Sequence, residues 1–157
     1  MQIYSLEIDD FSDNNYTLIG IHSTLEDYKL AYLLNSTLGT SFKKASYSLD
    51  FENKNNNASF SIYEFENRKL DTNWFLISNT YKNISKPEDT NGLFVESETT
   101  TYLIPEKKKV DFFLKLEGDF EYDFIIKTID KINQTKQIIT SYKVDAKTLK
   151  SKDFLIF

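Results

Sequence analysis

Three residues of this chain have side chains suited to acid-base chemistry at positions where catalytic groups are often found. His22 is the single histidine, and it stands at the end of an apolar run, directly before a predicted helix. Glu106 and Asp111 are five positions apart, and paired carboxylates can transfer protons or hold a divalent ion. On a helix, however, this spacing separates two side chains by about 140°. We therefore favour structural roles for all three residues and keep a carboxylate or histidine enzyme as an alternative.

The sequence lacks the usual motifs for nucleophiles and cofactors. It contains no cysteine, which excludes disulfides, thiolate nucleophiles and cysteine-based metal sites. With only four glycines, it has neither a Walker loop nor a Gly-x-Gly-x-x-Gly pattern. A single imidazole is a poor basis for a metal site. We therefore expect no cofactor and no metal, and we favour a protein that is not an enzyme.

A short basic run follows one of the two prolines. It consists of Lys107, Lys108 and Lys109. Because Phe112 and Phe113 follow closely, and lysines near aromatic rings suit single-stranded nucleic acid, an RNA-associated accessory protein is an alternative. The formal net charge of -5 repels phosphate backbones as a whole. We therefore interpret the run as a solvated face and do not expect nucleic acid as the partner.

Aromatic residues make up 15% of the chain, and Tyr and Trp are favoured at recognition surfaces. Trp74 and Tyr142 are the two binding candidates among them. The apolar C-terminal residues 154–157 could add a strand to the chain's own sheet or to that of a partner, and we expect the former. From these features we predict a non-catalytic protein-binding or adaptor module, whose partner is another protein or a second copy bound at an aromatic sheet edge.

The length of 157 residues predicts a single globular domain over residues 1–157. A hydrophobic share of 40% separates the chain from disordered sequences. The first residues, MQIYSLEIDDF, include acids where a signal peptide carries basic and then apolar residues. No apolar run approaches the roughly 18 residues that cross a membrane. We therefore expect a cytoplasmic protein without membrane contact.

Hydrophobic periodicity predicts the strands that would position these residues. They are expected at 4–8, 16–22, 46–52, 58–66, 72–79, 99–104 and 137–144. The first two are predicted to pair with each other, and a change of apolar phase within 58–66 predicts a bulge or a strand covered on both faces. Residues 81–98 are predicted to form the longest connection.

Three helices are expected, at 23–38, 107–117 and 119–134. A capping box of Ser23 and Glu26 would open the first, which has apolar residues around most of its circumference and should be covered on more than one side. In the second, Val110, Phe113 and Leu114 share a face. The order of elements indicates an α+β fold, in which a mostly antiparallel sheet of about six or seven strands packs against two or three helices.

The segment IPEKKKVDFF carries a specific resemblance. Its matching residues are Ile104, Pro105, Glu106, Val110 and Asp111. On these residues, and on segments 21–35, 74–79, 92–94 and 138–157, the chain resembles the IPExxxVDY proteins of Bacteroidetes over nearly its whole length. The resemblance implies a shared fold and brings no established activity with it. Where the family signature ends in Tyr this chain has Phe112, so we interpret the signature as structural.

Overall fold

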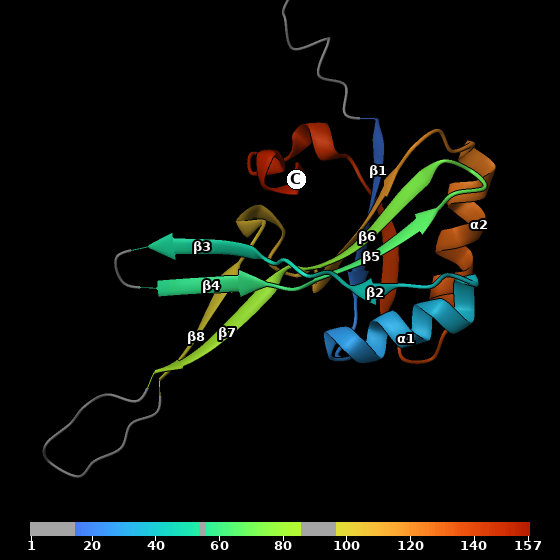
Figure 1. The fold of residues 1–157 in the computed structure, drawn as a ribbon. Helices are drawn as coiled ribbons and strands as arrows, with labels where there is room; N and C mark the ends of the chain where they lie inside the picture. Colours follow the sequence, from blue (N-terminus) through green and yellow to red (C-terminus); the bar gives the residue numbers. More distant parts are fainter. Residues whose placement is uncertain (1–14, 54–55, 86–96) are drawn as a thin grey trace, which may run out of the picture.

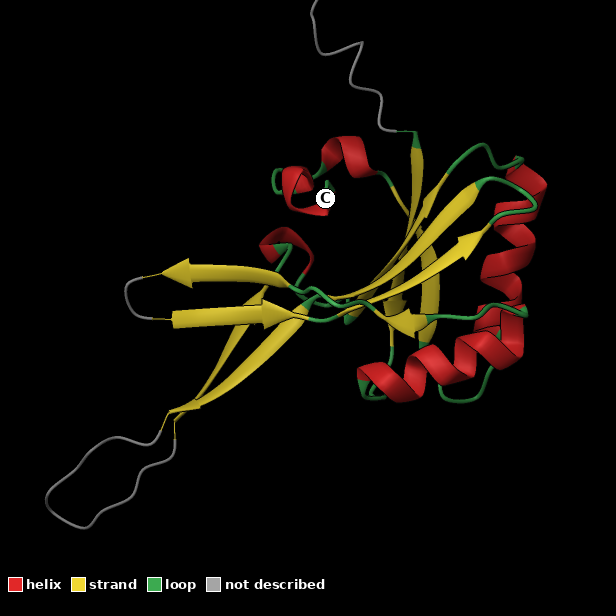
Figure 2. Cartoon of the chain, viewed as in Figure 1, coloured by secondary structure: helices red, strands yellow, loops and turns green. Residues whose placement is uncertain are grey.

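A six-stranded antiparallel sheet forms the centre of the computed structural model, which describes residues 15–53, 56–85 and 97–157 (Figures 1 and 2). Its strands are β1 (Tyr16–His22), β2 (Lys43–Lys44), β5 (Ile62–Asn67), β6 (Thr72–Ser78), β9 (Phe112–Glu117) and β10 (Thr140–Val144). They are arranged in the order β10-β1-β9-β6-β5-β2, and every neighbouring pair is antiparallel. With two helices beside this sheet, the predicted α+β class and its mostly antiparallel sheet are confirmed.

Two hairpins extend away from the main sheet (Figure 1). One joins β3 (Leu49–Asn53) to β4 (Asn56–Phe60), and the other joins β7 (Thr80–Ser85) to β8 (Ser97–Tyr102). The predicted strand 58–66 is broken at Ser61, where the chain passes from the β3–β4 hairpin into the main sheet. The predicted connection 81–98 is wrong at both ends, because β7 and β8 occupy them.

The helices α1 (Asp27–Leu38) and α2 (Tyr122–Asn133) cover one face of the sheet (Figure 1). No helix of the described residues is long and apolar enough to span a membrane. The helix α1 buries Leu30, Ala31 and Leu34, whereas Tyr28 and Tyr32 are 54% and 76% exposed. The prediction that this helix is covered on more than one side is therefore wrong.

The predicted capping box at the start of α1 is also wrong. Glu26 occupies the N-cap position without a side-chain cap. The Ser23 hydroxyl instead accepts from Leu25 N and donates to Gln137 O, so it joins the β1–α1 loop to the chain that leads into β10. The other end agrees with the sequence, because Gly39 ends the helix in the left-handed conformation with φ 69°.

The largest correction concerns residues 107–117, which do not form a helix. A short 3-10 turn, η2 (Pro105–Lys107), is followed by β9, which lies between β1 and β6 in the sheet. Phe112, Leu114 and Leu116 belong to the core under the helices, and Phe113 belongs to the core on the opposite face. Because both faces of β9 are covered, its residues form a continuous apolar run without the alternation that marks a half-buried strand.

The second face of the sheet is covered by the segment around η2 and by two C-terminal 3-10 turns, η3 (Ala146–Thr148) and η4 (Lys152–Leu155). Asp145 caps η3, as its position before the turn suggests, by accepting from Lys147 N. The C-terminal strand expected at 154–157 is wrong, since Phe154 and Leu155 lie in η4. The predicted strand 4–8 lies outside the described residues. Its expected partner β1 already has β9 on one side and β10 on the other.

Candidate functional site

The outer edge of β5 is open over part of its length. β5 has six residues, whereas its outer neighbour β2 has two, which pair Lys43 with Glu64 and Lys44 with Tyr63. Within the described ranges, no strand therefore lies beside residues 65–67 on that side. Strand edges that present free N–H and C=O groups readily pair with another chain.

A contact with α1 explains why β2 is so short. The side-chain amide of Asn35 accepts from the backbone N–H of Phe42 at 2.7 Å and donates to its carbonyl oxygen at 3.3 Å. The Phe42 ring is buried beside Phe65 and Trp74, with ring centroids 6.0 and 6.5 Å away. The backbone of Phe42 is therefore held by the helix, and the β2 ladder does not extend along the rest of β5.

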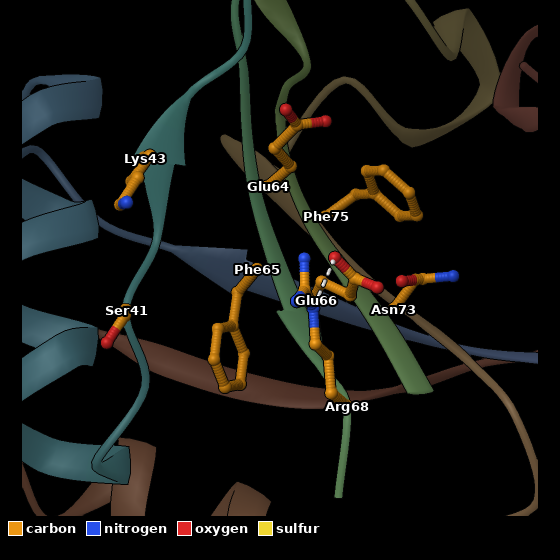
Figure 3. A pocket seen from close by; sticks show the side chains of 8 residues that line it. All are labelled: Ser41, Lys43, Glu64, Phe65, Glu66, Arg68, Asn73 and Phe75. Carbon is orange, nitrogen blue, oxygen red and sulfur yellow. Dashed lines mark ion pairs between the residues drawn. The ribbon is translucent and has the colours of Figure 1, made fainter. Parts of the chain in front are cut away.

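A pocket of about 580 Å³ opens beside this edge, a size typical of ligand sites (Figure 3). Its lining residues are Ser41, Lys43, Glu64, Phe65, Glu66, Arg68, Asn73 and Phe75. Lys43 is opposite Glu64, which is opposite Phe75, so these three side chains share one face of the sheet. At the end of β5 the Glu66 carboxylate pairs with the exposed Arg68 guanidinium at 3.5 Å. The pocket therefore combines acidic, basic and aromatic side chains.

Aromatic rings connect this pocket to the C-terminus of the chain. The Tyr47 hydroxyl donates to the Glu64 carboxylate at 3.3 Å. Phe157 packs against both Tyr47 and Phe75, with centroid distances of 6.3 and 5.1 Å. Burial, and then the neighbouring Glu64 carboxylate, raise the pKa of Tyr47, which keeps its phenol protonated as a donor.

The opposite edge of the sheet, β10, is closed at Ser141. Asn133, at the end of α2, accepts from the backbone N–H of Ser141 at 2.7 Å and donates to its carbonyl oxygen at 3.1 Å. Its amide thus occupies the outward backbone groups of Ser141, which an added strand would need there. Tyr142, one of the two predicted binding candidates, is 38% exposed and its hydroxyl is hydrogen-bonded to His22 Nε2 at 2.9 Å.

The three acid-base candidates have separate partners. His22 contacts Tyr142, whereas the Asp111 carboxylate accepts from Ser23 N at 2.9 Å. The Glu106 carboxylate accepts from both the backbone N–H and the hydroxyl of Ser151, at 2.7 and 3.0 Å. None of the three lines the pocket at β5. The described residues also include no group of three or more His, Asp or Glu suited to a metal ion.

The predicted binding candidates differ in their exposure. Trp74 is 4% exposed and packs among core aromatic rings, so its predicted place on a recognition surface is wrong. Lys108 and Lys109 are exposed and Lys107 is half-buried, which agrees with a solvated face. The Lys108 ammonium lies 5.7 Å from the centroid of the Tyr102 ring.

The signature segment around Pro105 is organised by a residue that the sequence did not single out. Asn79 is fully buried; its amide nitrogen donates to Lys107 O and Val110 O, and its amide oxygen accepts from Ile104 N. These bonds fix the turn between β8 and β9, and the Phe112 ring that follows is buried. The expected structural role of the signature is consistent with these contacts.

Sequence reasoning also missed the pocket residues Glu64, Glu66 and Arg68. Their one signal is the alternation of acids with aromatic rings in YEFEN, which marks a strand with one polar face. That pattern does not reveal that the strand lies next to an edge.

The fold and the site define a class of protein: an α+β domain with an antiparallel sheet, helices on one face and a charged pocket at an open strand edge. No family model, curated protein or solved structure matches the chain. Membership of the IPExxxVDY family stays a prediction.

Proposed function

We propose that this protein is a non-catalytic protein-binding module, which takes up an extended segment of a partner as an added strand along β5. The proposal is carried by one observation: β2 pairs with only two of the six residues of β5, and a pocket of about 580 Å³ lies beside the unpaired remainder. Strand addition to an exposed edge is a common mode of peptide recognition, in which main-chain bonds supply affinity and side-chain pockets supply specificity.

The direction of the backbone groups supports Glu66 as the docking residue. Ile62 O accepts from Ala45 N, so this carbonyl points outward, whereas Ser61 O accepts from Ser78 N on the β6 side. Because alternate residues of a strand bond to opposite neighbours, Glu64 and Glu66 also direct their N–H and C=O groups outward. Glu64 pairs with Lys43, which leaves the backbone of Glu66 for the partner strand.

The side chains around Glu66 suggest the chemistry of the partner segment. Residues directly opposite each other in an antiparallel pair have their side chains close together on one face, where opposite charges are favourable. The residue opposite Glu66 is therefore expected to be Lys or Arg. Lys43 and Arg68 lie on either side of Glu66 along the pocket. They favour an acidic residue two positions from the basic one, because only alternate residues of a strand share a face.

A displayed library of short linear peptides, selected on the full chain, tests this proposal. We expect enriched peptides in which a basic and an acidic residue are two positions apart. In synthetic copies of the best peptide, replacing one backbone N–H at a time by N–CH₃ should weaken binding at every second residue, because only alternate groups face β5. Failure to enrich any peptide, or N-methyl effects without this alternation, would overturn the proposal.

Two substitutions at one position separate backbone from side-chain recognition. Glu66→Pro removes the outward N–H together with the carboxylate, and proline is tolerated on an edge whose N–H does not bond within the sheet. Glu66→Val removes the carboxylate alone and keeps a residue that favours strands. We expect Pro to weaken peptide binding at least about tenfold more than Val. Equal losses, with both variants folded by circular dichroism, would contradict strand addition.

A further inference from the structure

We propose that a second pocket, which shares no lining residue with the pocket at β5, binds a planar aromatic molecule that carries an acidic group. The pocket has a volume of about 220 Å³. It is lined by residues of the β3–β4 hairpin, of β8 and the turn after it, and of the C-terminal turn η4. These residues are Phe51, Ala58, Phe60, Thr101, Tyr102, Leu103, Pro105 and Phe154.

Aromatic rings form much of the wall. Phe51 meets Phe60 edge-to-face at 5.8 Å between centroids, and meets Phe154 edge-to-face at 4.7 Å. Phe154 is 43% exposed although it belongs to this ring cluster, so part of the wall faces solvent. A dry cavity of about 150 Å³ with apolar walls binds benzene. The larger volume here suits one or two fused rings, which can add to the edge-to-face packing.

The rim of this pocket is basic, although the chain as a whole is acidic. None of the eight lining residues is charged. The Lys108 ammonium lies 5.7 Å from the centroid of the lining Tyr102 ring, and Lys107 and Lys109 flank it in the chain. An acidic substituent on a bound ring would be attracted to these lysines.

A contact between distant parts of the chain increases this local charge. Both carboxylate oxygens of Glu106 bond to Ser151, and this acid keeps its negative charge beside the lysines. The same contact brings Lys150 and Lys152, the neighbours of Ser151, close to the lysine run. The five lysines at 107–109, 150 and 152 outnumber the two acids among these residues, Glu106 and Asp153. The surroundings of the pocket therefore favour a carboxylate or phosphate over a neutral or cationic group.

Calorimetric titration of the full chain tests the two chemical requirements separately. Naphthoate supplies the ring and the charge, naphthol supplies the ring alone, and octanoate supplies a carboxylate without a ring. We expect saturable one-to-one binding of naphthoate, at least about tenfold tighter than that of the other two probes. No saturable binding of naphthoate, or equal binding of octanoate, would overturn the proposal.

Two further probes identify the source of the ligand. Adenosine monophosphate and naphthoate both combine an aromatic ring system with an anionic group. Tighter binding of adenosine monophosphate points to a nucleotide, and tighter binding of naphthoate points to a free aromatic acid. A single-stranded oligouridylate represents an unpaired base of RNA. If it binds more tightly than both small probes, the pocket belongs to a nucleic-acid surface and the small-molecule proposal is overturned.

Matched variants connect binding to the pocket. Ala58→Ile places a larger side chain in the cavity on a strand, where β-branched residues are favoured, and should weaken naphthoate binding at least about tenfold. Lys108→Gln should weaken naphthoate binding and leave naphthol binding unchanged, whereas Lys127→Gln, on α2 across the sheet, should change neither. If Ala58→Ile does not fold, Phe154→Ala removes a half-exposed wall and should give the same loss. Unchanged binding in the cavity variant that folds would overturn the assignment.

Discussion

The ammonium group of Lys115, in the middle of β9, donates to the carbonyl oxygen of Leu155 at 2.6 Å. Lys115 is 2% exposed, and its ammonium also pairs with the Glu117 carboxylate at 2.7 Å. The rings of Tyr16, Phe75 and Phe157 lie 5.0, 5.5 and 4.6 Å from its nitrogen. A buried charge is tolerated only when it is paired and hydrogen-bonded, and both conditions hold here. Lys115 therefore attaches the C-terminal turn η4 to the second face of the sheet.

We predict that Lys115→Met destabilises the protein and loosens its C-terminus. Methionine keeps an apolar stem but leaves the Leu155 carbonyl without its donor. An unsatisfied buried acceptor costs about 1–3 kcal/mol, so the free energy of unfolding in urea should fall by that amount. Amide hydrogen exchange should become faster in residues 152–157.

An exposed lysine supplies the control for this prediction. Lys82 pairs with Glu98 at 3.2 Å, and both side chains are more than half exposed. Lys82→Met should change the free energy of unfolding by no more than about 1 kcal/mol. Unchanged hydrogen exchange at the C-terminus of Lys115→Met would show that this bond does not hold the turn.

Residues 107–117, which include Lys115, were predicted as a helix because two periodic patterns fit them. Val110, Phe113 and Leu114 fit one face of a helix, while Phe112, Leu114 and Leu116 fit one face of a strand. Periodicity cannot decide between these patterns in a short apolar run. The pairing of β9 with β1 and β6, which does decide, depends on residues far apart in the chain.

Local patterns were sufficient elsewhere. The helix α2 and the strand β1 agree with the sequence to within a few residues, because α2 has a strong apolar period and β1 is a short apolar run that follows a polar segment. The candidate site at β5 could not be predicted in this way. It exists because Asn35 holds Phe42 and thereby shortens β2, and a tertiary contact of one amide with one backbone residue leaves no periodic signal.

Asn79 should be among the polar side chains on which stability depends most. Its amide makes three hydrogen bonds to the backbone of the turn between β8 and β9, in a fully buried position. Asn79→Ala leaves these partners unsatisfied, and we expect a loss of at least about 3 kcal/mol in urea unfolding. The matched control is Asn73→Ala, an exposed position on the preceding strand β6, with an expected change within about 0.5 kcal/mol. Similar losses in the two variants would disprove the special role of Asn79.

Gly118 ends β9 in a conformation that no other residue adopts easily. Its φ is 131°, and an added Cβ would lie 2.7 Å from Thr72 Cγ2. Gly39 has φ 69° with open space around it, so Gly39→Ala carries only the conformational cost of about 1–2 kcal/mol. We expect Gly118→Ala to lower the thermal midpoint more than Gly39→Ala does.

A second substitution separates the steric cost at Gly118 from the backbone cost. Thr72→Ser removes Cγ2 and keeps the hydroxyl that accepts from Trp74 Nε1 at 3.3 Å. Added to Gly118→Ala, it should recover part of the lost thermal midpoint, and the remainder is the cost of the backbone conformation. No recovery would mean that contact with Thr72 contributes nothing.

The contact between Glu106 and Ser151 predicts a dependence of stability on pH. Partial burial acts to raise the pKa of Glu106, but hydrogen bonds from the backbone and hydroxyl of Ser151 outweigh it, and the pKa is lowered from its ordinary value of 4.5. A carboxylate with a lowered pKa stabilises the folded state above its unfolded pKa, and this contribution is lost as the pH falls through the folded value.

Urea unfolding from about pH 6 to about pH 3 should therefore show Glu106→Gln less stable than the native chain at the upper end, with a difference that shrinks as the pH falls. A difference for Glu106→Gln that stays constant across this range would mean that its carboxylate is not preferentially stabilised in the folded protein.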